Sequence, residues 1–148
     1  MNINGVKIMP ITKHCDDRGF FSEIFKTNSG WMESPKQFSM TKTNAGIIKA
    51  FHKHMFQIDI WYVLSGMAKV VLHEELPDDG IYTDVFYLGE DNCQVLLIPK
   101  HIWHGYQVLG NKPITLFYIT DQIYNKENPD EYRTDPNHFR DNWEIINR

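Results

Sequence analysis

Short alternating segments separated by turn residues run through most of the sequence, and they limit the folds that it can adopt. Segments of this kind, rich in β-branched and aromatic residues, are 5–11, 20–26, 37–44, 47–54, 57–64, 67–76, 81–88, 93–99, 104–109 and 114–120. Turn sequences such as DDRG, PDDG and GEDN stand between several of them, and these residue types favour tight reversals of the chain. Many short strands at nearly regular spacing predict an all-β fold, an antiparallel sandwich or barrel.

The end of the sequence has a different pattern. Alternation is lost in NPDEYRTDPNHFRDNWEI, residues 128–145, and we expect a short C-terminal helical segment there. The total of 148 residues suits a single domain over residues 1–148 with its own hydrophobic core.

Composition and charge exclude several classes of protein. The formal net charge of -4 gives no indication of a nucleic-acid-binding surface. No apolar run approaches the ~20 residues of a membrane helix. Cys15 and Cys93 lie far apart, and the start of the sequence lacks a signal-peptide pattern. We therefore expect reduced thiols and a cytoplasmic location.

Two histidines one residue apart are the strongest sign of a functional site. His52 and His54 project to one face if their segment is a strand, and Asp59 begins the next segment. The spacing G-x5-H-x-H-x4-D-x6-G resembles the first motif of the cupins, with Asp59 where most metal-binding cupins have a glutamate. PKHIWHGYQV resembles the second motif and supplies His104, although His101 stands where a glycine is usual. We expect a cupin-like antiparallel jelly-roll barrel with His52, His54, Asp59 and His104 facing one cavity.

A second resemblance covers more of the sequence, roughly residues 5 to 143. DDRGFFSEIF, QFSMTKTNAGIIKAFH, LIPKHIWHGYQVL and FYITDQIYNKENPDEYR resemble, in the same order, four motifs of the dTDP-4-dehydrorhamnose 3,5-epimerase family. That family has a cupin-like jelly roll and needs no metal. The resemblance implies an epimerase or isomerase of deoxysugar biosynthesis, with a nucleoside-diphosphate 4-keto-6-deoxyhexose as substrate, a dTDP-sugar favoured, and with no cofactor and no nucleic-acid or membrane partner. It also implies a homodimer.

The resemblance assigns the catalytic roles to three residues. His52 matches the base that removes a proton next to the keto group, and Tyr124 matches the acid on the opposite face of the sugar. Asp59 stands where the family has a lysine near the sugar carbonyl. In the family, a separate aspartate pairs with the base. We expect no residue of the sequence, which runs to Arg148, to match that aspartate. Asp59 is therefore the candidate to orient His52 or His54 in its place.

Substrate binding is assigned to a larger group. Arg18 matches an arginine that contacts the diphosphate, for which a guanidinium is well suited, and Lys49 keeps the charge of a family arginine. The substrate-binding candidates implied by the resemblance are Arg18, Phe21, Glu23, Gln37, Lys49, His54 and His104.

Two other functions remain open. A metal-dependent cupin enzyme would use His52, His54, Asp59 and His104 as ligands, a set that suits a divalent transition metal. A non-catalytic sugar-nucleotide-binding cupin would keep the pocket without the chemistry. Within the epimerase reading, 3,4-ketoisomerisation needs similar proton transfers and is not separated from epimerisation by sequence.

Overall fold

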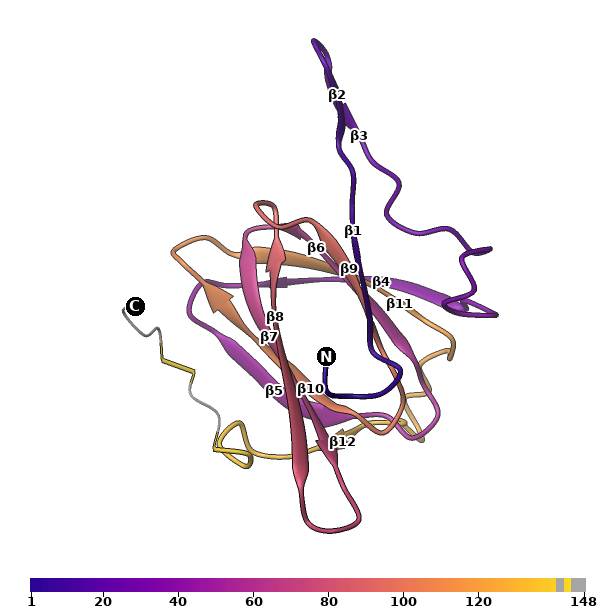
Figure 1. The fold of residues 1–148 in the computed structure, drawn as a ribbon, viewed down its shortest axis with the longest axis vertical. Coiled ribbons are helices and arrows are strands. Elements are labelled where there is room, and N and C mark those ends of the chain that lie inside the picture. Colours follow the sequence, from indigo (N-terminus) through magenta and orange to yellow (C-terminus); the bar gives the residue numbers. More distant parts are fainter. Residues whose placement is uncertain (141–142, 145–148) are drawn as a thin grey trace.

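Two five-stranded antiparallel sheets face each other in the computed structural model, which describes residues 1–140, 143 and 144 (Figure 1). The first sheet has the strand order β1-β9-β6-β11-β4 and the second has the order β12-β5-β10-β7-β8. A separate pair, β2 and β3, forms a hairpin that projects away from the sheets. The strands are β1 (Lys7–Pro10), β2 (His14–Asp16), β3 (Gly19–Phe21), β4 (Gln37–Thr43), β5 (Ile48–Lys53), β6 (Asp59–Ser65), β7 (Met67–Glu75), β8 (Ile81–Gly89), β9 (Gln94–Ile98), β10 (Trp103–Leu109), β11 (Ile114–Thr120) and β12 (Tyr132–Arg133).

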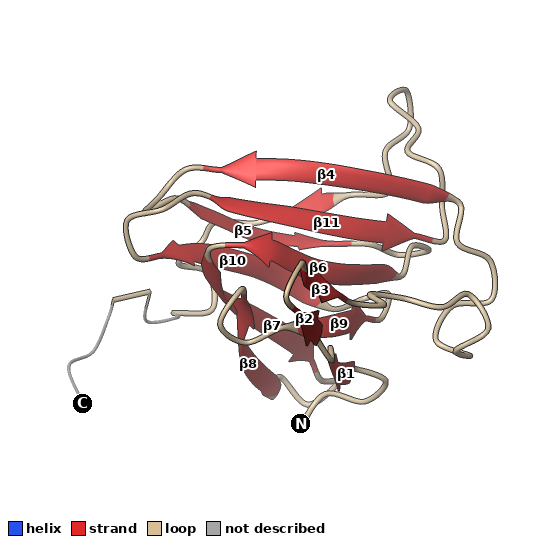
Figure 2. Cartoon of the chain, turned by 90° about the horizontal axis from the view of Figure 1, so that it is seen from above, coloured by secondary structure: helices blue, strands red, loops and turns tan. Residues whose placement is uncertain are grey.

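The predicted all-β jelly-roll barrel is confirmed, and its core lies between the two sheets (Figure 2). Alternate residues of β6, such as Trp61 and Val63, pack in this core with residues of β7, β8 and β10. The other residues of β6, Ile60 and Tyr62, are also buried, because they pack against a second apolar cluster that includes Met32. Burial on both faces explains why β6 reads as a nearly continuous apolar run.

The predicted C-terminal helical segment is wrong for the described residues, which contain no helix. Within 128–145, Tyr132 and Arg133 instead form β12 and pair with Lys53 and His52 of β5. This pairing supplies hydrogen-bond partners to an edge strand, a gain that an isolated short helix lacks. Prolines at 129 and 136 also interrupt any helix in this region. Positions 141, 142 and 145 of the prediction lie outside the described residues.

In the part of the chain that the structure describes, there is no helix with the length and hydrophobicity needed to cross a membrane.

Candidate active site

A cavity of about 600 Å³ opens between the two sheets. Its walls come from β4, β5, β6, β10, β11 and β12, from the β5–β6 connection and from the segment between β11 and β12. Six of the predicted site residues line it, namely Gln37, Lys49, His52, His54, Asp59 and Tyr124. The cavity therefore brings together predicted residues as far apart in the sequence as Gln37 and Tyr124, which are 87 positions apart.

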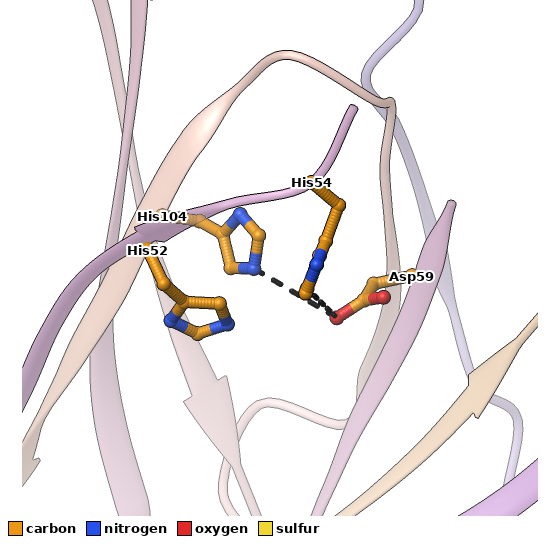
Figure 3. A group of neighbouring side chains, drawn as sticks. All are labelled: His52, His54, Asp59 and His104. Atoms are coloured by element: carbon orange, nitrogen blue, oxygen red, sulfur yellow. Dashed lines mark ion pairs between the residues drawn. The ribbon is translucent and has the colours of Figure 1, made fainter. Parts of the chain in front are cut away.

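Three histidines and one aspartate meet at the inner end of the cavity (Figure 3). One donor atom from each of His52, His54, Asp59 and His104 lies within 4.8 Å of the others. Oδ2 of Asp59 lies 3.8 Å from Nε2 of His104 and 4.0 Å from Nε2 of His54. The rings of His52 and His104 have centroids 4.0 Å apart. Of the four residues expected to face one cavity, His52, His54 and Asp59 line it, whereas His104 is 1% exposed and lies behind the cavity wall with its donor atom next to theirs.

Strand pairing brings His52 and His104 together. The two residues are register partners in the β5–β10 ladder. The next residue, Gly105, lies so close to Ala50 that an added Cβ would be 2.7 Å from the Ala50 Cα. Because real side chains do not tolerate this distance, glycine at 105 permits the close approach of β5 and β10 that sets the two imidazoles face to edge.

His101 occupies the position where the cupin motif has a glycine. Its φ is 71°, in the left-handed region that glycine favours. The backbone N–H of His101 donates a 2.6 Å hydrogen bond to the carbonyl of His54. The motif's backbone shape is therefore kept despite the different side chain.

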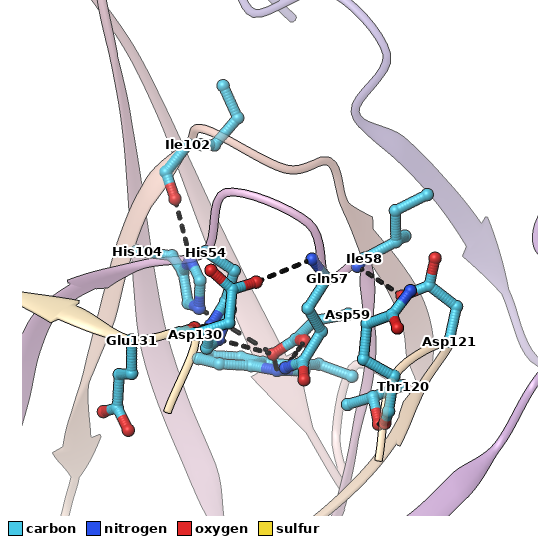
Figure 4. A network of polar contacts seen from close by, with 12 residues as sticks. His54, Gln57, Ile58, Asp59, Ile102, His104, Thr120, Asp121, Asp130 and Glu131 are labelled. Carbon is cyan, nitrogen blue, oxygen red and sulfur yellow. Dashed lines mark hydrogen bonds and ion pairs between the residues drawn. The ribbon is translucent and has the colours of Figure 1, made fainter. Parts of the chain in front are cut away.

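Hydrogen bonds fix the orientation of two of the imidazoles (Figure 4). Nδ1 of His104 lies 2.8 Å from the carbonyl oxygen of Ile102, and Nδ1 of His54 contacts the carbonyl oxygen of Asp130. Because a carbonyl oxygen only accepts, each Nδ1 must carry the proton. In the neutral rings, both Nε2 lone pairs then face the Asp59 carboxylate. Nε2 of His104 is buried and has no hydrogen-bond partner.

The Asp59 carboxylate is held on both oxygens. Oδ1 accepts a hydrogen bond from Nε2 of Gln57 at 2.7 Å, and Oδ2 accepts one from Nε1 of Trp61 at 3.0 Å. Asp59 is itself 4% exposed. These contacts fix its position beside His54 and His104.

Burial controls the charge of the histidines. It lowers the pKa of His52 far below its ordinary value, and repulsion from two neighbouring histidines and Arg133 lowers the pKa further. Burial also lowers the pKa of His104 to about 4, although the Asp59 carboxylate and a backbone carbonyl oppose the shift. Both rings are thus neutral at neutral pH, and each has a lone pair available.

A second aspartate holds the β5–β6 connection in place. The carboxylate of Asp130 accepts hydrogen bonds from the backbone N–H groups of Met55 at 2.9 Å, Phe56 at 2.8 Å and Gln57 at 3.0 Å. Neither Asp130 nor Arg133, which lines the cavity, was among the site residues predicted from the sequence. The sequence marks Asp130 only as one of three acidic residues within 127–131, with Glu127 and Glu131, since a contact across about 75 positions leaves no local pattern.

Three of the predicted binding residues lie away from this cavity. Arg18 and Phe21 belong to the projecting β2–β3 hairpin, and Glu23 lines a separate cavity of about 260 Å³. The Arg18 side chain is 85% exposed and pairs with Asp16 at 2.5 Å. Within one chain, therefore, the structure does not bring these residues to the site.

Comparisons with known proteins identify the family. The profile of the family described as dTDP-4-dehydrorhamnose 3,5-epimerase matches residues 1–148. The spore coat polysaccharide biosynthesis protein SpsL of Bacillus subtilis is 47% identical over 133 residues, which cover 88% of each chain. A crystal structure of a dTDP sugar isomerase from Desulfovibrio desulfuricans has a TM-score of 0.83 at 18% identity, covering 93% of this chain and 88% of that one.

A second solved structure carries a ligand. The epimerase RmlC from Legionella pneumophila, in complex with dTDP-4-keto-L-rhamnose, has a TM-score of 0.77 at 22% identity, over 90% of this chain and 74% of that one. At these identities the two structures show the shared fold. The match of the family profile along the whole sequence shows more, and this chain belongs to the dTDP-4-dehydrorhamnose 3,5-epimerase family.

Proposed function

We propose that this enzyme epimerises a nucleoside-diphosphate 4-keto-6-deoxyhexose, with a dTDP-sugar as the favoured substrate, and that His52 and Tyr124 carry the two proton transfers. The observation that carries the proposal is that His52 and Tyr124, which match the family's base and acid, line one cavity. The bound dTDP-4-keto-L-rhamnose of the Legionella protein supports the substrate class.

The chemistry follows from the keto group. A carbonyl at C4 acidifies the protons on C3 and C5, because the carbanion left behind is stabilised as an enolate. Neutral His52 accepts one of these protons on its free lone pair, and the Tyr124 hydroxyl then donates a proton to the opposite face of the same carbon. The sugar is recovered with one inverted centre, and subsequent proton exchange with water restores both side chains.

Asp59 has a supporting role in this scheme. Its contacts are with His54 and His104 rather than with His52. We infer that Asp59 orients those two imidazoles, which lie against the His52 ring. Gln37, Lys49 and His54 on the cavity wall are the residues proposed to hold the sugar nucleotide, with His104 behind them.

Arg18, Phe21 and Glu23 fit the proposal if the enzyme is a homodimer. Arg18 and Phe21 lie on the hairpin that projects beyond the sheets of its own chain, Glu23 follows it in the sequence, and Arg18 and Phe21 are largely exposed. A hairpin of this kind can extend to a neighbouring copy, where Arg18 would bind the diphosphate of the partner's substrate. We propose that arrangement, together with a cytoplasmic location, where nucleotide sugars are made, and a role in polysaccharide biosynthesis.

Solvent exchange tests the reaction directly. The protein is incubated in D2O with dTDP-4-keto-6-deoxyglucose, and deuterium at C3 and C5 is followed by NMR. We expect incorporation at one or both carbons. Movement of the keto group from C4 to C3 would instead identify a ketoisomerase, and tight binding without any incorporation would identify a binding protein.

A further inference from the structure

The donor atoms of His54, Asp59 and His104 are spaced as the ligands of one metal ion. Nε2 of His104 and Nε2 of His54 lie 3.8 Å and 4.0 Å from Oδ2 of Asp59. Donors around a tetrahedral ion with bonds of about 2.1 Å lie roughly 3.4 Å apart. The two distances to Asp59 exceed this spacing by a few tenths of an ångström, and all donor atoms of the cluster lie within 4.8 Å of one another.

The surrounding hydrogen bonds point the free lone pairs of the two imidazoles at the same place. Each Nδ1 proton is donated to a backbone carbonyl, of Ile102 for His104 and of Asp130 for His54. In metal sites, ligating histidines almost always donate their other ring N–H to an acceptor of this kind. The arrangement around these imidazoles is thus that of metal ligands with their outer partners in place.

One buried atom in the set has nothing else to bind. Nε2 of His104 is buried without a hydrogen-bond partner, a condition that is rare in native proteins and calls for an explanation. The lone pair of a neutral imidazole and a carboxylate oxygen are both hydrogen-bond acceptors. They therefore form no hydrogen bond with each other. A cation between them would bind both.

We infer that a divalent transition-metal ion of the Zn²⁺ or Fe²⁺ class binds Nε2 of His54, Nε2 of His104 and Oδ2 of Asp59. The mixed imidazole and carboxylate donors select this class of ion. Within residues 1–140, 143 and 144, no other group of histidine, cysteine or acidic residues has donor atoms gathered in this way. The inference departs from the metal-free site that the family resemblance implies.

His52 is the fourth member of the cluster, and we leave it outside the ligand set. It lines the cavity and, unlike His54 and His104, is not among the buried residues, so His52 is the imidazole best placed to meet a substrate. The family has a lysine at the position of Asp59, and its positive charge is lost in this chain. When bound, the cation would supply a positive charge beside the substrate's keto oxygen in its place. This catalytic role depends on the proposed function, but the binding of the ion does not.

Metal binding is measured on the full chain after chelation and dialysis, by calorimetric titration with Zn²⁺ and by elemental analysis. We expect one ion per chain, and a rise in melting temperature on adding Zn²⁺. His54→Ala and Asp59→Asn should each weaken binding by about 100-fold or more, since loss of even an outer partner costs about 10–100-fold. His14→Ala removes an exposed histidine and should bind as the unmodified protein does.

Each of three results would contradict one part of the inference: the site, its ligand set or its catalytic role. Zn²⁺ binding that is substoichiometric, or that is unchanged in both His54→Ala and Asp59→Asn, would show that these residues do not form a metal site. If His52→Ala no longer binds the ion, His52 is itself a ligand and cannot be the free base proposed here. Full deuterium exchange by metal-free protein would remove the catalytic role of the ion, while exchange itself would still support the proposed epimerase.

The absorption spectrum of the Co²⁺-loaded protein gives a readout that does not depend on activity. A tetrahedral or five-coordinate site with nitrogen and oxygen donors should give visible bands that Asp59→Asn shifts or abolishes. A spectrum identical to that of aqueous Co²⁺ would contradict the assigned ligands.

Discussion

The side-chain oxygen of Gln37 accepts a hydrogen bond from the backbone N–H of Tyr124 at 2.8 Å. This contact ties the first residue of β4 to the segment that follows β11. Tyr124 is 57% exposed at the cavity, so few other contacts restrain it. The position of the proposed acid therefore depends on a residue 87 positions earlier.

Replacement of Gln37 should slow delivery of the second proton. Gln37→Met keeps the size of the side chain but removes the acceptor for the Tyr124 N–H, and a misplacement of about 1 Å can cost ~10²-fold in rate. Gln37→Glu retains an acceptor oxygen and should recover most of the loss. Epimerised product is measured by NMR for both variants. Equal rates for Gln37→Met and the unmodified enzyme would show that this contact does not position Tyr124.

Asp59→Asn should lower the rate of deuterium exchange. Both carboxylate oxygens accept hydrogen bonds, from Gln57 and Trp61, so the NH2 of an asparagine must face one of these donors. The buried mismatch displaces the side chain from His54 and His104, and we expect a fall of roughly 10–100-fold. A higher rate would mean instead that the Asp59 charge opposes the enolate.

Asp130→Ala should loosen the β5–β6 connection. It removes the acceptor for three backbone N–H groups, of Met55, Phe56 and Gln57. Because the site is partly exposed, water can replace some of these contacts. We therefore expect a loss of about 1–3 kcal/mol in the free energy of unfolding. Urea denaturation measures this loss, and Glu127→Ala, an exposed acidic change in the same segment, is the control with an expected effect within about 0.5 kcal/mol. Equal stability of the two variants would contradict the role given to Asp130.

Mixing two inactive variants tests whether Arg18 serves a partner's cavity. If it does, a mixed dimer of Arg18→Ala and His52→Ala has one complete site, and random exchange of subunits should restore about a quarter of the unmodified activity. If Arg18 acts within its own chain, every site in the mixture lacks one residue and no activity returns. Sedimentation of the unmodified protein should show a homodimer.

The sequence carried local information well and long-range information poorly. The i, i+2 spacing of His52 and His54 and the two motifs were sufficient to predict that these side chains cluster with Asp59 and His104, because strand period and motif register determine which face a residue occupies. The C-terminal helix was predicted wrongly because pairing of β12 with β5 has no local signature. The contacts of Asp130 were missed for the same reason.

Arg18 illustrates a different limit. Its motif predicts contact with the diphosphate, yet in one chain it lies on a hairpin away from the cavity. A motif records the residue's chemistry but not which copy of the chain it serves.

Deuterium exchange by His52→Ala and Tyr124→Phe is the most direct test of the account. His52→Ala should lose exchange next to the keto group by about 10²–10⁴-fold, since it lacks the base that forms the enolate. Tyr124→Phe should retain that first exchange but form epimerised product slowly, because the acid acts after the enolate exists. Exchange by His52→Ala at the rate of the unmodified enzyme would contradict the assignment of His52 as the base.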